Sequence, residues 1–318
     1  MPHKPSNNPV HVAVAAVFDD AGRVLITLRP DHVHQGGLWE FPGGKIEAGE
    51  SVSAALAREC HEELGIELQQ TRPLIRVSHA YPDKSVLLDV WRVDGFTGEA
   101  HGKEGQPFKW VKPEQLADFS FPEANLPIIH SVHLPDQYLI TPDPGGDSRV
   151  FLKQLEKCLS KGVRLVQLRA KSLSQEDYIK LAKQVKNLCV EFAAKLILNS
   201  DPEWVDIVDA DGVNLTGDRL LALNHRPLPA NKLVAASCHT GEDIAHASQI
   251  GVDFAMLSPV QATASHPETI PIGWDRFRAM SEHAAFPVYA LGGVRPDDLD
   301  TAFDYGAQGI AAIRALWD

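Results

Sequence analysis

The chain has 318 residues, of which 44% are hydrophobic and 23% are charged, and its formal net charge is −12. One domain usually has about 100–200 residues, so two domains are expected. The excess of acidic residues repels a polyanionic backbone and argues against direct binding of DNA or RNA. A single small nucleotide remains compatible with this charge, because a bound divalent cation can reverse the local sign.

Cysteine spacing and the N-terminus indicate the compartment. The four cysteines lie far apart and form no CxxC pair, which is typical of reduced thiols rather than of disulfides or a zinc site. The N-terminus carries no apolar segment of a secretory signal, and the apolar run Val12–Phe18 is too short to cross a membrane. The sequence therefore predicts a cytoplasmic protein without a membrane partner, and it leaves a homo-oligomer open.

Residues 1–133 alternate short β-like runs with one strong helix. Strands are predicted at Val10–Phe18, Arg23–Leu28, Leu74–Ser78, Val86–Val93 and Phe108–Val111. The helix, Val52–Leu64, places Leu56, Cys60 and Leu64 on one apolar stripe. Strands around a single dominant helix predict an α+β domain in which a mixed sheet is sandwiched by helices.

Residues 134–318 alternate apolar strands with amphipathic helices. The predicted strands are Tyr138–Thr141, Leu165–Leu168, Lys195–Leu198, Gly212–Leu215, Leu233–Ala236, Phe254–Leu257, Val288–Leu291 and Gly309–Ala312. The predicted helices are Val150–Ser160, Gln175–Ala193, Glu203–Val208, Glu242–Ile250, Trp274–Ala284 and Asp297–Tyr305. Strict alternation with eight strands predicts a second domain that is an α/β TIM barrel of the (β/α)8 type. It is shorter than the usual length of about 250 residues, so a short or missing helix is expected within Asp218–Asn231.

A motif with many fixed positions includes the predicted helix of the first domain. Residues 44–66 read GKIEAGESVSAALARECHEELGI and match the pattern GX5EX7REUXEEXGU, where U is a bulky aliphatic residue. The one departure is Cys60 at the first U, and a small apolar thiol can still fill a core position. Arg58 can pair with Glu50 and fix the junction between loop and helix.

Three carboxylates of this motif share one helix face. Glu59, Glu62 and Glu63 stand at positions i, i+3 and i+4 of the predicted helix. Their like charges repel unless a cation binds, and Mg²⁺ prefers oxygen ligands. The spacing therefore predicts a site for a divalent cation on this face of the helix.

The pattern is the Nudix box, and residues 10–130 resemble the MutT branch of the Nudix family. The flanking segments that carry the resemblance are Gly36–Glu47, Gly102–Pro107 and Phe121–Asn125. The resemblance implies Mg²⁺-dependent, or Mn²⁺-dependent, hydrolysis of 8-oxo-dGTP to the monophosphate and pyrophosphate, which removes a mutagenic nucleotide from the pool used in DNA replication. It implies as metal ligands Gly44, Glu59, Glu62, Glu63 and Glu104. Glu59 would also orient or deprotonate the attacking water.

The same resemblance implies a nucleotide site. It is lined by Arg29, His34, Phe41 and Asp83, and Asn125 would hydrogen-bond to the oxidised purine edge. Two alternatives stay open: Asn125 as the cap of a helix that begins near residue 126, and His34 as an ordinary loop histidine. Lys84 stands where the family often has arginine. A damaged thiamine diphosphate or another nucleotide is the alternative substrate.

Four segments of the second domain resemble the thiamine phosphate synthase/TenI family of barrels: Gln167–Lys171, Ala236–Thr240, Leu257–Val260 and Ala290–Val294. The resemblance implies a thiamine-related phosphate as ligand. It implies as phosphate-binding residues Gln167, Arg169, Lys171, Gly292, Gly293, Ala312 and Ile313.

Three departures from the synthase pattern remove a magnesium ligand and a pyrophosphate-binding lysine. An Asn-Asp pair is Asn199-Ser200, a His-Leu-Gly-Gln segment is Asn214-Leu215-Thr216-Gly217, and a Thr-Lys-Lys segment is Thr263-Ala264-Ser265-His266. TenI barrels instead isomerise a thiazole phosphate, with a histidine at the position of His239 as general acid and base. The alternative is a barrel that binds its ligand without catalysis.

Overall fold

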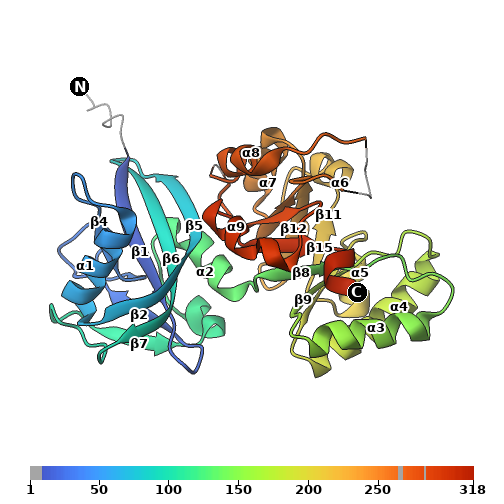
Figure 1. The fold of residues 1–318 in the computed structure, drawn as a ribbon, viewed down its shortest axis with the longest axis horizontal. Helices are drawn as coiled ribbons and strands as arrows, with labels where there is room; N and C mark the ends of the chain where they lie inside the picture. The colour runs from blue at the N-terminus through green and yellow to red at the C-terminus, as the bar shows by residue number, and fades with distance from the viewer. Residues whose placement is uncertain (1–8, 264–267, 283) are drawn as a thin grey trace. The chain divides into compact units, whose positions relative to one another are not determined.

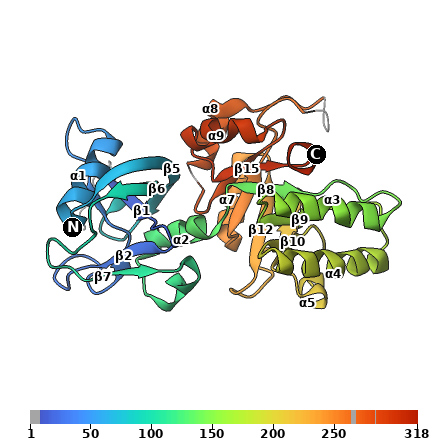
Figure 2. The same cartoon turned by 60° about the horizontal axis from the view of Figure 1, so that its bottom comes forward.

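The structure is a computed structural model that describes residues 9–263, 268–282 and 284–318, and Figures 1 and 2 show it in two orientations. The chain divides into two compact units, Met1–His133 and Leu134–Asp318. Each unit has hydrophobic cores of its own, and none of these cores draws residues from both units. Among the described residues, no helix has the length and apolar character needed to cross a membrane.

The first unit contains two sheets. Its strands are β1 (Val10–Val17), β2 (Val24–Leu28), β3 (Trp39–Glu40), β4 (Gly43–Lys45), β5 (Glu67–Ala80), β6 (Ser85–Thr97) and β7 (Phe108–Val111). The larger sheet has the order β4-β1-β6-β5 and the smaller one the order β3-β2-β7. The larger sheet is mixed, because β1 runs parallel to β6 and antiparallel to β4.

Helices cover both faces of the larger sheet. The helical segments of the first unit are α1 (Val52–Leu64), η1 (Pro113–Asp118), η2 (Glu123–Asn125) and α2 (Leu126–His133). Ala13 and Ala15 of β1 pack in the core that α1 covers, whereas Val14 and Ala16 pack in the core that α2 covers. This alternation follows from the two-residue period of a strand. The predicted α+β sandwich is confirmed.

The strands of the first unit differ in extent from the prediction. β5 and β6 form one long hairpin with several register shifts, far longer than the apolar runs at residues 74–78 and 86–93. Residues 67–72 are mostly polar, so strand pairing rather than hydrophobic alternation makes them extended. β3 and β4 were not predicted, because runs of two and three residues carry no periodic signal.

The second unit is a closed barrel of eight strands, as predicted. The strands are β8 (Gln137–Ile140), β9 (Leu165–Leu168), β10 (Lys195–Leu198), β11 (Gly212–Leu215), β12 (Leu233–Cys238), β13 (Phe254–Leu257), β14 (Val288–Leu291) and β15 (Gly309–Ala312). The helical segments are α3 (Ser148–Ser160), α4 (Gln175–Glu191), α5 (Trp204–Val208), α6 (Gly217–Ala222), α7 (Gly241–Ile250), α8 (Gly273–Ser281), η3 (Pro296–Asp298), α9 (Leu299–Asp304) and α10 (Arg314–Trp317). α6 has only six residues, so the expected short helix lies in this segment.

The barrel strands send alternate residues inward. Tyr138, Phe254 and Tyr289 fill the inside together, with ring centroids 5.5 to 5.8 Å apart. Their strand neighbours pack outward against the helices. The same alternation points polar side chains inward at the carboxyl ends of the strands, among them Asn214 and Ser237. Barrel active sites are built at this end.

Candidate functional site

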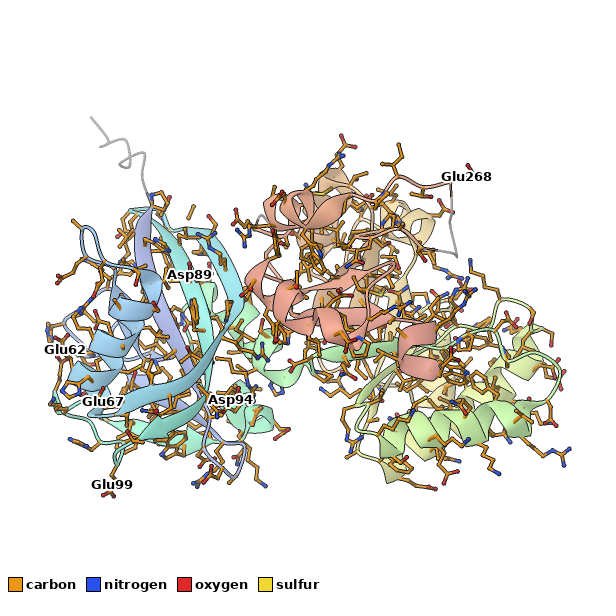
Figure 3. The ribbon with its side chains drawn as sticks, in the orientation of Figure 1. Glu62, Glu67, Asp89, Asp94, Glu99 and Glu268 are labelled. Carbon is orange, nitrogen blue, oxygen red and sulfur yellow. The ribbon has the colours of Figure 1, made fainter. Side chains whose placement is uncertain are left out.

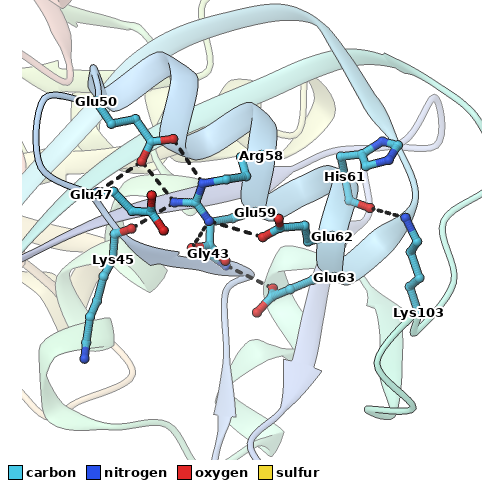
Figure 4. Close-up of polar contacts among 10 residues, drawn as sticks. All are labelled: Gly43, Lys45, Glu47, Glu50, Arg58, Glu59, His61, Glu62, Glu63 and Lys103. Carbon is cyan, nitrogen blue, oxygen red and sulfur yellow. Dashed lines mark hydrogen bonds and ion pairs between the residues drawn. The ribbon is translucent and has the colours of Figure 1, made fainter.

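Helix α1 and strand β4 hold the motif residues of the first unit together. Ser51 caps the helix by accepting a hydrogen bond from the amide of Ala54 at 3.2 Å, and Gly65 ends it in a left-handed conformation. The apolar stripe of α1 is buried, including Cys60. Glu59 and Glu63 face β4, because Glu63 accepts a hydrogen bond from the amide of Gly43 and the carboxylate of Glu59 lies against Gly44. Figure 4 shows these carboxylates beside Gly43.

Arg58 organises the acidic residues around it (Figure 4). Its guanidinium donates to both oxygens of Glu50 at 3.0 Å and to the carbonyl of Lys45 at 3.0 Å. The pair with Glu50 confirms the predicted junction between loop and helix. Arg58 also donates to Glu59 at 2.8 Å and to Glu62 at 3.2 Å. One planar cation therefore fixes the loop, the helix and two of the predicted metal ligands.

Three carboxylates lie near enough to Glu63 for their charges to raise its pKa, and we call Glu40, Glu59, Glu63 and Glu104 the carboxylate cluster. Burial and the charges of the other three carboxylates together raise the pKa of Glu63 to about 8. The amide of Gly43 donates to Glu63 at 3.2 Å and opposes this shift. Such a concentration of negative charge is the electrostatic setting that a bound cation would relieve.

The backbone comes unusually close to the cluster at Gly44. A Cβ atom at this position would lie 2.0 Å from Oε1 of Glu59, so only glycine leaves room for that carboxylate. This cradle and the oxygen-rich donor set fit a hard divalent cation. No group of three His, Cys, Asp or Glu side chains within the described residues is already arranged to hold a metal ion. Arg58 holds Glu59 and Glu62 instead.

Glu62 lies apart from the cluster. Figure 3 marks it on α1, and 53% of its side chain is exposed. The structure therefore brings Glu59 and Glu63 together toward β4, while Glu62 turns to Arg58 at the surface. The reason is a competing cation, since the Arg58 guanidinium stands one helical turn before Glu62 and donates to its carboxylate.

A loop docks on the end of α1 and brings in the last predicted ligand. The amide of Lys103 and the side-chain amide of Gln106 both donate to the carbonyl of Glu63, at 2.9 Å each. The ammonium of Lys103 donates to the carbonyl of His61 at 3.2 Å, also drawn in Figure 4. Glu104 is thereby held close enough to raise the pKa of Glu63.

The predicted nucleotide residues gather around a second set of contacts. Arg29 donates to the carbonyl of His34 at 2.8 and 3.1 Å and forms an ion pair with Glu40. His34 lies 3.5 Å from the carboxylate of Asp83, so the loop after β2 meets the turn between β5 and β6. Arg29 thus links this loop to the carboxylate cluster.

Two further predicted residues of the nucleotide site are buried. Phe41 is 2% exposed and stacks on Phe121 with 5.7 Å between ring centroids. Asn125 is 8% exposed, ends η2 and directly precedes α2. A buried amide with both a donor and an acceptor can read a purine edge.

Sequence reasoning missed Glu40 and Tyr81. Glu40 belongs to the Trp39-Glu40-Phe41 flank, and burial raises the pKa of its carboxyl although the charge of Arg29 lowers it. Tyr81 directly precedes the turn that contains Asp83, and its ring packs edge-on against His34 with centroids 5.2 Å apart. The sequence offered one signal for both residues, because Glu40 precedes Phe41 and Tyr81 lies two residues before Asp83, and both neighbours belong to the predicted nucleotide site.

In the barrel, His239 follows β12 at the carboxyl end of the strands. Its Nδ1 lies 2.9 Å from the carbonyl of Ser258 and 3.3 Å from the hydroxyl of the same residue. A carbonyl only accepts, so this contact selects the tautomer with a proton on Nδ1 and a lone pair on Nε2. The imidazole is therefore arranged to accept a proton through Nε2.

The other predicted barrel residues are spread over several strand ends. Gln167 is buried and accepts a hydrogen bond from the Tyr138 hydroxyl at 2.9 Å, so it belongs to the core inside the barrel. Arg169 follows β9 and is half-buried, whereas Lys171 is exposed. The remaining predicted residues are backbone positions at the ends of β14 and β15: Gly292, Gly293, Ala312 and Ile313.

The residues at the departures do not fit the magnesium site that the synthase family implies. Asn214 donates to Oδ1 of Asn199 and to the hydroxyl of Ser237, both at 3.1 Å. Ser200 is buried, and Asp201 forms an ion pair with Arg219 at 3.1 Å. Amides and hydroxyls thus occupy these positions, where a divalent cation would require carboxylates. Residues 264–266 of the third departure lie outside the described residues.

Comparisons with known proteins match the two units separately. A NUDIX domain model matches residues 13–131, and a thiamine monophosphate synthase model matches residues 137–316. The 8-oxo-dGTP diphosphatase of Escherichia coli strain K12 is 38% identical over 120 residues, which are 38% of this chain and 93% of that protein. The putative thiamine-phosphate synthase 2 of Aquifex aeolicus is 40% identical over 182 residues, which are 57% of this chain and 97% of that protein.

A solved structure adds a further likeness. It comes from a study of MutT from Aliivibrio salmonicida and Vibrio cholerae, is 40% identical, and has a TM-score of 0.35. The match covers 39% of this chain and 97% of that one.

Proposed function

The chain belongs to the NUDIX domain family through its first unit and to the thiamine monophosphate synthase family through its second, and on this premise we propose that the first unit hydrolyses 8-oxo-dGTP. The products are the nucleoside monophosphate and pyrophosphate. We assign this activity to residues 1–133 and a ligand-binding barrel to residues 134–318. The observation that carries the proposal is the buried Asn125, which shares a domain with the carboxylate cluster.

Three members of the carboxylate cluster, together with Gly44 and Glu62, would hold magnesium, with Mn²⁺ as a substitute. The proposed ligands are Gly44, Glu59, Glu62, Glu63 and Glu104. When bound, the metal offsets the negative charge of the phosphoric anhydride. Glu62 would have to leave Arg58 to join the other ligands.

Glu59 is the proposed base. The water oxygen bonds to phosphorus as the P–O bond to the leaving group breaks, and the water proton goes to Glu59. Arg58 holds Glu59 at 2.8 Å and fixes the direction in which its carboxylate points. The nucleotide lies against Arg29, His34, Phe41 and Asp83, and Asn125 hydrogen-bonds to the purine edge.

A hydrolysis screen with Mg²⁺ tests the reaction. The substrates are 8-oxo-dGTP, the ordinary nucleoside triphosphates, thiamine diphosphate and oxidised thiamine diphosphate, each with wild type and Glu59→Gln. We expect pyrophosphate release from 8-oxo-dGTP at the highest kcat/KM and a loss of at least about 100-fold in Glu59→Gln. A higher kcat/KM for either form of thiamine diphosphate would show that the substrate is a thiamine diphosphate and not a nucleotide. Both units would then bind thiamine-related phosphates.

A second function is favoured by the tautomer of His239. We propose that the barrel binds a thiamine-related phosphate and that His239 moves a proton in the isomerisation of a thiazole phosphate through Nε2. Backbone groups after β14 and β15 and the cations Arg169 and Lys171 would hold the phosphate. Turnover of thiazole phosphate by wild type but not by His239→Ala is expected. Binding with no turnover in either protein would leave the barrel as a binding module only.

A further inference from the structure

Tyr81 stands where three segments of the proposed nucleotide site meet. These segments are the loop after β2, which carries His34; the turn after β5, which carries Asp83; and η2, which carries Asn125. None of the three is adjacent to another in the sequence. Their arrangement therefore depends on tertiary contacts rather than on local backbone preference.

The ring of Tyr81 contacts the first segment directly. Its centroid lies 5.2 Å from that of His34, edge to face, and 4.4 Å from that of His79 on β5. The backbone amide of Tyr81 donates to the carbonyl of Lys84 at 2.8 Å and closes the turn around Asp83.

The hydroxyl of Tyr81 reaches the third segment. It accepts a hydrogen bond at 3.4 Å from the amide of Ala124, the residue before Asn125. Two contacts between a histidine and a carboxylate join the same segments: His34 lies 3.5 Å from Asp83, and His79 lies 3.6 Å from Glu123 of η2. Tyr81 thus contacts all three segments: those of His34 and Asn125 through its side chain, and the turn of Asp83 through its backbone amide.

We propose that Tyr81 is a positioning residue that sets the base specificity of the hydrolase. It holds His34, Asp83 and Asn125 in one arrangement, and the phenol hydroxyl fixes the backbone from which Asn125 projects. This inference rests on the proposed function of the first unit. It predicts an effect on nucleotide recognition and not on the chemical step, because Tyr81 does not contact the carboxylate cluster in any described interaction.

The test measures KM and kcat for 8-oxo-dGTP and dGTP in the full chain. Tyr81→Phe removes only the hydroxyl, and it should raise KM for 8-oxo-dGTP about two- to tenfold, the effect of one lost hydrogen bond, with kcat unchanged. The preference for 8-oxo-dGTP over dGTP should fall by a similar factor. Tyr81→Leu, which also removes the ring contacts, should reduce that preference further.

Tyr305→Phe is the control, since Tyr305 belongs to the second unit, where its ring packs on Trp274. It should leave both constants unchanged. An unchanged KM and an unchanged preference in Tyr81→Phe would overturn the proposal, as would a loss in kcat alone.

The wild-type values separate this inference from the proposed function. If wild type does not prefer 8-oxo-dGTP, the substrate assignment fails, and the role of Tyr81 is then judged on KM for the best nucleotide of the screen. If Tyr81→Phe leaves the KM for that nucleotide unchanged, the inference is contradicted. If the variant raises this KM and leaves kcat constant, the inference is supported.

Discussion

Glu63 is a largely buried carboxyl close to other carboxylates, and its pKa is strongly raised. Burial and the charges of the neighbouring carboxylates together raise the pKa of its carboxyl from an ordinary value of 4.5 to about 8. Between these two values the folded chain binds more protons than the unfolded chain. The stability that results is fully present below pH 4.5 and is lost as pH rises through about 8.

The metal-free protein should therefore become less stable between about pH 5 and pH 8, by at most about 1.4 kcal/mol per pH unit from this group. Glu63→Gln should flatten that part of the profile, because the amide does not titrate. Chemical denaturation in EDTA across this range measures the effect. Glu62→Gln is the control, since the Glu62 side chain is 53% exposed. Parallel profiles for wild type and Glu63→Gln would contradict the assignment.

Gly44 offers a second prediction at a single residue. Alanine would place a Cβ atom 2.0 Å from the Glu59 carboxylate, which is the mobile end of a flexible side chain. Gly44→Ala should displace Glu59, lower hydrolysis at least about 100-fold and leave Tm nearly unchanged. Gly146→Ala in the barrel, where a Cβ would meet open space, should change neither. A large loss of Tm with the same kcat per folded molecule would refute this account of Gly44.

The site residues show what spacing in a sequence can predict. Helical periodicity placed Glu59 and Glu63 on one side of α1, and the structure has them both facing β4. Periodicity could not foresee that Glu62 turns to Arg58, because that choice depends on a competing cation. Glu40 joins the cluster from β3, and no local pattern links a strand of two residues to a helix.

At the scale of elements, predictions succeeded where hydrophobic periods were long. The eight barrel strands and helix α1 were all located from their patterns, and α1 has the same limits as predicted. The β5–β6 hairpin extends well beyond its apolar runs, because cross-strand pairing organises polar residues that have no periodic signal of their own. The segments that the sequence did not predict are those that strand pairing stabilises and that have no hydrophobic periodicity of their own.

The strand ends of the barrel make a prediction about metal dependence. Asn199, Asn214 and Ser237 form a neutral hydrogen-bonded group where a synthase would need a carboxylate. The thermal shift that thiamine monophosphate produces in the barrel should therefore be the same in EDTA as in Mg²⁺. Asn214→Leu should reduce this shift in both buffers. A shift that vanishes in EDTA would show that other residues supply a metal site.

At the scale of the whole molecule, the two units have separate cores. Calorimetry should consequently resolve two unfolding transitions. Mg²⁺ with a nonhydrolysable nucleotide should raise one of them, and thiamine monophosphate should raise the other. A single transition that both ligands raise together would show energetic coupling between the units and contradict their independence.

The central claim is that the first unit selects an oxidised purine nucleotide. The most direct measurement is the ratio of kcat/KM for 8-oxo-dGTP to that for dGTP, with Mg²⁺ and the full chain. We predict a ratio of at least about tenfold, which one well-placed hydrogen-bonding side chain can provide, and its loss in Asn125→Ala. Equal kcat/KM values for the two nucleotides would contradict the claim while leaving hydrolysis by the carboxylate cluster intact.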